Sequence, residues 1–395
     1  MSLDQATLRA MAEMSDEVGV LSAYVTLDPQ TRAEPATKPP WELRLRHSLA
    51  QEKDRLKETG PRAHYAAFTD RLERLRLDLE RLLDPAAPGQ GRALFAGVSD
   101  GQVRTVSLQV PLVDRVVVEP QAHLRPLVAA WSAAGPAGVA AVSADEVRVI
   151  DLRFGWVEEV ATVAYEPTTG ESRQLKGPAA ANPAMAQHSA PQQDLFERRE
   201  EDKLLRFLRT VGPRLATLSK EREWEHLVIT GEAHLVQAVT EGLPHGAEAE
   251  VVTLSHPVAT LTPPKIAATV EPALEAARQR RRRHLVEKAH DAAMSANAGA
   301  WGLGETLDGL QQGRVAHLLL HADGQWAGSR TPDGRLVPAG EVPPGVDADA
   351  MIDEADLAER MLELAFRNGG KVTMLAAEDS APLVDAGGVA ALLRW

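Results

Sequence analysis

The stretch Trp301–Leu320, WGLGETLDGLQQGRVAHLLL, decides how the C-terminal part of the chain folds. A glycine-rich turn leads into an amphipathic helix, and the apolar run after it is typical of a buried strand. The same order returns in 351–375, where we expect Asp353 and Glu354 to open a second helix before a strand in NGGKVTML (368–375). The chain ends in DAGGVAALLRW (385–395), and we expect Val389, Leu392 and Leu393 there to be core residues. The sequence therefore predicts an α/β domain at this end.

Length and composition exclude several protein classes. A chain of 395 residues with 44% hydrophobic content predicts two or three globular domains. The absence of cysteine excludes disulfides, thiolate catalysis and cysteine zinc sites. No apolar run reaches the ~20 residues that span a bilayer, and the N-terminus has no signal-like segment, so we expect a cytoplasmic protein without a membrane partner. A net charge of −13 argues against bulk electrostatic coating of nucleic acid but allows local basic patches.

Residues 1–125 read as an N-terminal α/β domain. An apolar strand is expected at 18–27, and two helices fill 41–83 with a break at Gly60-Pro61. The second helix carries one apolar stripe at helical spacing, which we expect to pack on a sheet. The stripe consists of Tyr65, Phe68, Leu72, Leu75, Leu79 and Leu82. Further strands are expected at 93–98, 103–110 and 114–118.

Residues 126–258 read as a second domain. A β-meander at 139–165 is followed by a segment, 166–193, without periodicity, which we expect to be a mobile loop. A charged helix then starts at Asp194 as N-cap. Its apolar stripe consists of Leu204, Leu208, Val211 and Leu215. A buried strand at 226–231, a helix at 234–242 and a strand at 250–254 complete this domain, and a third domain, 259–395, opens with a helix at 265–293.

Two basic runs are candidate nucleic-acid contacts. The first lies on the charged helix and consists of Arg198, Arg199, Lys203, Arg206 and Arg209. The second consists of Arg280, Arg281, Arg282 and Arg283. Four consecutive helical residues point all around a helix, so at least one of this second run must face the core. The competing interpretation for both runs is a solvated face whose arginines pair with neighbouring glutamates and aspartates.

Motifs for catalysis with metals or cofactors are missing. Gly302 and Gly304 lack the third glycine of a dinucleotide fingerprint, and Gly369-Gly370-Lys371 lacks the rest of a P-loop. The 12 histidines show no zinc-ligand spacing, and no nucleophile elbow is present. We therefore expect neither a metal nor a cofactor.

The element order of 301–395, with Gly387-Gly388 before an apolar tripeptide and Arg394-Trp395 at the end, resembles the C-terminal domain of the archaeo-eukaryotic class-1 release factors and their pelota relatives. The order of elements in 137–258 is also similar to the middle domain of that family. The resemblance implies a three-domain α/β fold and the ribosome as partner, through rRNA and, as a further candidate, tRNA. It also implies a translational GTPase as candidate partner of the C-terminal domain.

Departures from the family pattern bear on function. True release factors carry Gly-Gly-Gln in the middle-domain loop, whereas the corresponding GPAAANPAMAQHSAPQQ (177–193) has no glycine pair. The stop-codon motif TASNNIKS is also missing, which argues against stop-codon decoding. The chain therefore most resembles the bacterial branch of the family, which includes Balon-type hibernation factors. Gln187, Gln192 and Gln193 are the weak catalytic candidates, and His188 is a candidate for stacking on a base. The competing interpretation is that all four are ordinary solvent-exposed loop residues.

Three functional hypotheses follow. The first is a non-catalytic factor that occupies the A site of idle or stalled ribosomes, in hibernation or rescue. The second is a peptidyl-tRNA hydrolase acting through a loop glutamine, since ester hydrolysis needs a placed donor and water more than a titrating group. The third is an interaction protein on the same fold that has no connection with ribosomes.

Overall fold

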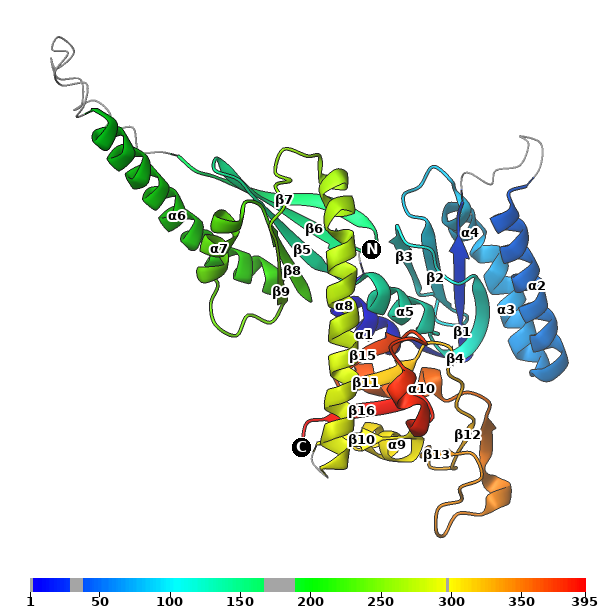
Figure 1. The fold of residues 1–395 in the computed structure, drawn as a ribbon. Coiled ribbons are helices and arrows are strands. Elements are labelled where there is room, and N and C mark those ends of the chain that lie inside the picture. Colours follow the sequence, from blue (N-terminus) through cyan, green and yellow to red (C-terminus); the bar gives the residue numbers. More distant parts are fainter. Residues whose placement is uncertain (1–2, 29–37, 167–188, 296–297) are drawn as a thin grey trace. The chain divides into compact units, whose positions relative to one another are not determined.

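The computed structural model describes residues 3–28, 38–166, 189–295 and 298–395 (Figure 1). The chain divides into two compact units, one formed by Met1–Ala134 with Gln279–Trp395 and the other by Gly135–Arg278. Sheets and helices occur in both, which confirms the predicted mixed α/β multidomain fold. The three-domain division at 125 and 258 remains a prediction. In the described residues, no helix has the length and hydropathy needed to cross a membrane.

The N-terminal segment of the first unit contains a four-stranded antiparallel sheet in the order β3-β2-β1-β4. Its strands are β1 (Ser15–Thr26), β2 (Gly91–Gly97), β3 (Val103–Leu108) and β4 (Arg115–Gln121). The helices of this segment are α1 (Gln5–Ala12), α2 (Pro40–Thr59), α3 (Arg62–Arg74), α4 (Arg76–Leu83) and α5 (Arg125–Ala134). The expected second helix is in fact two, α3 and α4, with Leu75 between them. Phe68, Leu75 and Leu82 are buried against Leu21 and Leu94 of the sheet, which confirms the predicted packing of the stripe.

The C-terminal segment of the same unit has a four-stranded sheet in the order β10-β16-β11-β15. The strands are β10 (Gly299–Trp301), β11 (Val315–His321), β15 (Lys371–Leu375) and β16 (Val389–Leu393). The elements around them are α9 (Leu303–Gln311), α10 (Ala358–Arg367) and the 3-10 helices η4 (Ala348–Ala350) and η5 (Ala381–Ala386). β11 and β15 are parallel, with α10 in the connection between them, whereas β16 is antiparallel to β10 and β11.

A small sheet, β13-β12-β14, corrects one sequence prediction. It consists of β12 (Gly328–Arg330), β13 (Leu336–Pro338) and β14 (Ile352–Glu354). Asp353 and Glu354 do not open a helix, because they form β14 and pair with Ser329 and Gly328 of β12. The helix α10 begins at Ala358, whose amide donates to the Asp356 carboxylate (3.0 Å).

The C-terminal strand differs in part from the expected core. Val389 is fully buried, but Leu392 and Leu393, at the C-terminal end of β16, are only half-buried. Gly388 adopts a φ of +80°, and a Cβ there would lie 3.1 Å from the His321 Cβ. Glycine permits both this φ and this close approach of the two chain segments.

Contacts between residues far apart in the sequence join the two segments of the first unit. The Glu359 carboxylate, in the first turn of α10, accepts from the backbone amides of Leu124 (2.7 Å) and Arg125 (3.0 Å). The Arg125 guanidinium donates to the carbonyls of Ala322 (2.6 Å) and Gly324 (2.5 Å). The start of α5 is therefore capped by a residue more than two hundred positions away.

The second unit contains a five-stranded sheet in the order β7-β6-β5-β8-β9. The strands are β5 (Ala137–Val142), β6 (Glu146–Arg153), β7 (Trp156–Ala164), β8 (His226–Thr230) and β9 (Glu250–Leu254). The meander β5-β6-β7 is antiparallel, and β5, β8 and β9 are parallel. One face is covered by α6 (Ser189–Glu221) and α7 (Ala233–Glu241), and the other by the first half of α8 (Pro263–Met294). These elements match the predicted order.

The start of α6 differs from the sequence prediction. The helix begins at Ser189 rather than at Asp194, which lies inside it. Pro191 falls in the first turn, where its missing N–H removes no helical hydrogen bond and its fixed φ suits the helix. The expected mobile loop therefore ends by residue 188, and residues 167–188 lie outside the described residues.

The crossing of α6 and α7 gives a testable prediction for the fold. A Cβ on Gly212 would lie 2.2 Å from the Gly242 carbonyl carbon, too close for any side chain. We expect Gly212→Ala to destabilise the second unit by about 3 kcal/mol, because the contact is with backbone that cannot rotate away. Hydrogen exchange of α6 and α7 amides in the full chain measures this. Gly304→Ala, in α9, is the control, since its Cβ would meet only the Pro338 Cγ at 3.9 Å; equal exchange in both variants would contradict the prediction.

Candidate nucleic-acid interface

The helix α6 has an apolar face and an opposite basic face. Leu208, Val211 and Leu215 are buried against the sheet. With about 3.6 residues per turn, the five basic side chains from Arg198 to Arg209 all lie on the side away from that stripe. Arg198, Arg199, Arg206 and Arg209 are exposed, and in Figure 1 the N-terminal turns of α6 extend beyond the strands of this unit. The arrangement presents cationic side chains to a partner without disturbing the core.

Ion pairs divide this basic set into two groups. Lys203 Nζ lies 2.9 Å from Glu200 Oε1. This pair agrees with the competing interpretation, in which the basic residues pair with acidic residues of the same helix. Arg209 Nη2 lies 2.9 Å from Glu241 Oε2 of α7, and this hydrogen bond, followed by that from Gln237, lowers the pKa of Glu241. Arg198, Arg199 and Arg206 have no ion pair to any side chain that the structure describes. These three are the cations most available to an anionic partner.

The connection into α6 contains the glutamine and histidine candidates. Gln187 and His188 lie outside the described residues, while Gln192 and Gln193 belong to the first turns of α6 rather than to a loop. At the other end of this connection Tyr165 follows β7, and its ring centroid lies 5.2 Å from that of Phe207 on α6. The exit from β7 is therefore fixed against the helix, next to Arg206.

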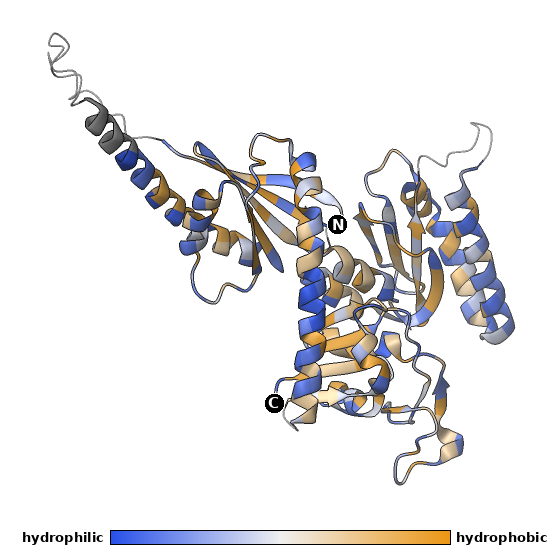
Figure 2. Cartoon of the chain, viewed as in Figure 1, coloured by the Kyte–Doolittle hydropathy of each residue, from blue (hydrophilic) through white to orange (hydrophobic). Residues whose placement is uncertain are grey.

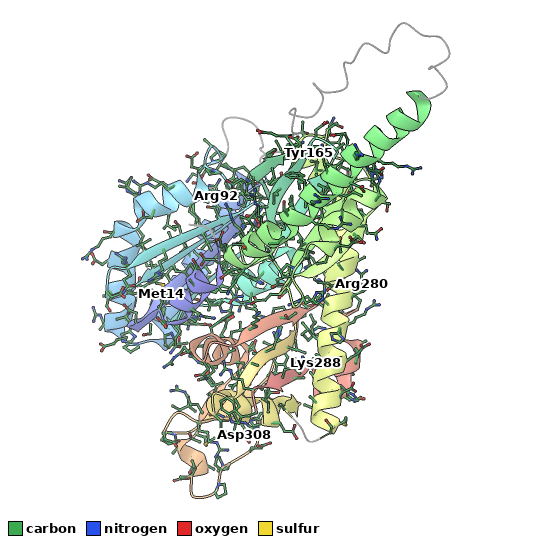
Figure 3. All side chains as sticks on the ribbon, turned by 90° about the vertical axis from the view of Figure 1, so that its left-hand side faces the viewer. Met14, Arg92, Tyr165, Arg280, Lys288 and Asp308 are labelled. Carbon is green, nitrogen blue, oxygen red and sulfur yellow. The ribbon has the colours of Figure 1, made fainter. Side chains whose placement is uncertain are left out.

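The second basic run lies on α8, where Figure 2 shows a hydrophilic band. Arg282 faces the core, as expected for at least one member: its Nε lies 2.5 Å from Oδ2 of the fully buried Asp379. Arg283 is exposed and lies 3.6 Å from the other oxygen of that carboxylate. Arg280 is exposed, and Figure 3 shows it on α8 with Lys288. The run is thus anchored by a buried ion pair and does not form one uniform patch.

A further positive cluster was not found from the sequence. His317 on β11 makes a hydrogen bond of 2.8 Å between its Nε2 and Thr373 Oγ1 of β15. Burial, followed by the positive charges of Lys371, Arg281 and Lys288, lowers the pKa of His317 to about 3. The strand pairing of β11 with β15, and their placement near α8, brings these cations together; no spacing in the sequence signals it.

His317 gives a pH-dependent prediction. Because its folded pKa lies below the unfolded value of about 6.5, the fold favours the neutral ring. Its contribution is complete above pH ~6.5 and falls by up to about 1.4 kcal/mol per pH unit as the pH decreases. We expect the free energy of unfolding of the wild type to fall more steeply from pH 7 to 5 than that of His317→Gln. Parallel pH profiles for the two proteins would contradict this.

Comparisons with known proteins agree with the element order. Residues 136–254 match the family model of bacterial archaeo-eukaryotic release factor family 5. No curated protein matches the chain. Among solved structures, an archaeal translation termination factor, aRF1, is 16% identical, with 100% of this chain and 99% of that chain covered and a TM-score of 0.25. Dom34 of S. cerevisiae is 9% identical, with 77% and 79% covered and a TM-score of 0.39.

Archaeal Pelota, in a model of its ribosome-bound form with ABCE1, is 13% identical, with 99% and 94% covered and a TM-score of 0.40. At these scores and identities the structural likenesses assign no function. The matched residues 136–254 comprise all five strands of the second unit together with α6 and α7. The similarity to the bacterial archaeo-eukaryotic release factor family is therefore a property of this segment, residues 136–254.

Proposed function

We propose that this protein is a ribosome-associated translation factor that occupies the A site of idle or stalled ribosomes. The observation that carries the proposal is the outward basic face of α6, which contains Arg198, Arg199 and Arg206 and lies within the segment matched by a release-factor family model. rRNA presents a dense array of phosphates, and arginine is well suited to bind them. Because the whole chain carries a net charge of −13, the attraction has to come from such a local face.

The test of A-site binding is competition. The full chain is expected to co-sediment with bacterial ribosomes that have a vacant A site, and to be displaced when that site is filled with tRNA. Ribosome binding that is unaffected by tRNA in the A site would contradict binding at that site. No co-sedimentation at low salt would favour an interaction protein unconnected with ribosomes.

A translational GTPase that acts through the C-terminal segment is a further part of the proposal. It predicts that such a GTPase co-purifies with the full chain in a nucleotide-dependent way.

Peptide release is expected to be weak or nil. The segment 177–193 lacks the glycine pair that permits positive φ before the release-factor glutamine, and Ala184-Met185-Ala186 precede Gln187. Gln192 and Gln193 lie in a helix, whose hydrogen-bonded backbone limits how far it can adapt to an ester. The measurement is release of labelled peptide from stalled ribosomes by the wild type and by Gln187→Ala, Gln192→Ala and Gln193→Ala. Strong wild-type release that one of these changes abolishes would establish the hydrolase hypothesis instead.

A further inference from the structure

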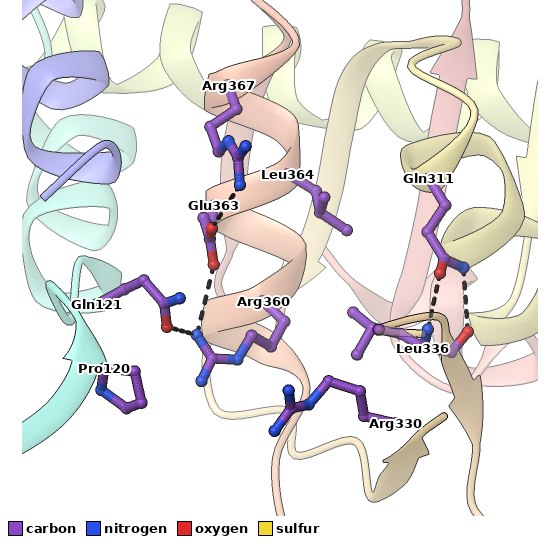
Figure 4. Close-up of a pocket in the computed structure, with 10 residues that line it drawn as sticks. Pro120, Gln121, Gln311, Arg330, Leu336, Arg360, Glu363, Leu364 and Arg367 are labelled. Carbon is purple, nitrogen blue, oxygen red and sulfur yellow. Dashed lines mark hydrogen bonds and ion pairs between the residues drawn. The ribbon is translucent and has the colours of Figure 1, made fainter. Parts of the chain in front are cut away.

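A pocket of about 260 Å³ opens in the first unit where the end of β4, the small sheet and α10 meet (Figure 4). Its walls come from segments far apart in the sequence. The lining includes the side chains of Pro120, Arg330, Leu336, Arg360, Glu363 and Arg367. None of them belongs to the basic face of α6, so the pocket is separate from the proposed ribosome contact.

Positive charge dominates the lining. Three guanidinium groups line the pocket together with a single carboxylate, that of Glu363. Glu363 lies between two of them, with Oε2 at 3.4 Å from Arg360 Nη1 and Oε1 at 3.0 Å from Arg367 Nη1. Arg330 pairs instead with Glu354, which does not line the pocket, at 3.3 Å. With Glu354 counted, two carboxylates pair with the three arginines, which leaves one positive charge that an anionic ligand would balance.

The guanidinium groups also keep hydrogen-bond capacity for a ligand. An arginine has five N–H donors in a planar fork. Arg367 donates from Nη1 to Glu363, and Arg330 donates from Nε to Glu354. Arg360 donates from Nη1 to Gln121 and Glu363. Figure 4 shows Arg330 and Arg360 both extending toward the end of β4, where Pro120 and Gln121 lie. Forks that converge in this way suit the oxygens of a phosphate, which arginine binds by two parallel hydrogen bonds.

The remaining walls restrict what can accompany the phosphate. Leu336 and Leu364 form an apolar side, and Pro120 lies across the pocket from them, beyond Arg360 (Figure 4). Gln311 holds that side in place, because its amide nitrogen donates to the Leu336 carbonyl (3.0 Å) and its amide oxygen accepts from the Leu336 amide (2.7 Å). The volume lies just below the ~300–1,000 Å³ typical of small-molecule sites. We propose that the pocket binds a small phosphate ester, of about the size of a nucleoside monophosphate.

Such a ligand would bridge the two segments of the first unit. It would contact Pro120 and Gln121 from the N-terminal segment and the arginines from the C-terminal segment. A ligand that binds only the folded state raises the unfolding temperature, and the gain in stability grows with the logarithm of its concentration above Kd. The proposal therefore has two readouts, direct binding and ligand-dependent thermal stability, and neither depends on ribosomes.

The experiment uses the full chain, with inorganic phosphate and ribonucleoside monophosphates as probes, in calorimetric titrations and thermal scans. The variants are Arg330→Gln and Arg367→Gln, whose side chains are 42% and 58% exposed, so that folding should be unaffected. Arg335→Gln is the matched control, because Arg335 is 51% exposed and pairs with Asp308 at 3.1 Å but does not line the pocket. We expect Kd to rise at least about tenfold in the first two variants and to stay unchanged in the control.

The outcomes separate the sources of the phosphate. Tighter binding of the nucleoside monophosphates than of inorganic phosphate supports a contribution from the apolar side, and equal binding supports a site for phosphate itself. Absence of saturable binding below roughly 10 mM overturns the proposal. So does binding that neither Arg330→Gln nor Arg367→Gln weakens. An effect of these variants on binding of an RNA oligonucleotide alone would also overturn it, in favour of a polymer contact.

Discussion

Replacing Arg198, Arg199 and Arg206 together by glutamate is expected to weaken ribosome association roughly 100-fold at low salt. Each arginine that contacts a phosphate releases a counterion, so the logarithm of affinity falls with the logarithm of salt concentration by close to one unit per contact. The variant is therefore expected to show a salt dependence flatter by about three units. The three side chains are exposed and have no ion pair within the described part of the chain, so the fold should be unaffected. Co-sedimentation at several salt concentrations measures both quantities.

A matched variant separates the α6 face from bulk charge. Arg74, Arg76 and Arg81 lie on α3 and α4 and are 68%, 72% and 78% exposed. Their replacement by glutamate changes the net charge by the same amount, and their exposed ion pairs contribute little to stability. We expect this control to bind ribosomes nearly as the wild type does. Equal losses of ribosome affinity in the two variants would mean that only the net charge matters. Unchanged ribosome affinity of the α6 variant would mean that this helix does not contact the ribosome.

Deleting residues 388–395 is expected to unfold most of the first unit. β16 lies inside the C-terminal sheet, between β10 and β11, so its loss removes two strand pairings at once. Val389, Ala390 and Ala391 are fully buried. Burial of one valine contributes about 1.5–3 kcal/mol and each lost backbone hydrogen bond about 1 kcal/mol. The sum is comparable with the whole stability of a typical domain, about 5–15 kcal/mol.

Thermal unfolding of the full and truncated chains tests this. Removal of Trp395 alone is the control, because its side chain is 68% exposed and its loss is expected to cost less than about 1 kcal/mol. The control should unfold close to the wild-type unfolding temperature, while the longer deletion should lack the unfolding transition of the first unit. A truncated chain that melts at the wild-type temperature would show that β16 is dispensable.

Patterns local in the sequence predicted most elements. The apolar stripe of Leu204, Leu208, Val211 and Leu215 indicated α6, and the stretch HLVITG (226–231), with three apolar residues at its centre, indicated the buried β8. Local patterns failed where a partner strand decided the structure. Asp353 and Glu354 have the composition of a helix start, yet the edge of β12 pairs with them. Leu392 and Leu393 are apolar yet only half-buried, because burial depends on which elements cover each face of the sheet, and local sequence does not determine that.

In the candidate sites too, local sequence predicted some features, while tertiary contacts determined the others. The basic face of α6 follows from helical spacing, and its position opposite the apolar stripe could be derived before the structure. Arg360, Glu363 and Arg367 also share a helical face by spacing. The pocket that they form was not predictable, because Arg330 lies on β12 and Pro120 on β4. Only the tertiary fold brings these strands next to α10. Gln192 and Gln193 lie in a helix and not in the predicted loop, because Pro191 fits a first helical turn as well as it fits a loop.

The division of the first unit has a consequence for how the chain folds during synthesis. Residues 135–278 leave the ribosome as one continuous block that contains all of its own strand partners. The first 134 residues emerge earlier, yet the Glu359 carboxylate that caps α5 and the carbonyls that hold Arg125 are made only near the end of translation. Domains fold as units when their contacts become available. The inserted block is thus able to complete its structure first, while the N-terminal sheet waits for the last segment of the chain before its contacts with that segment can form.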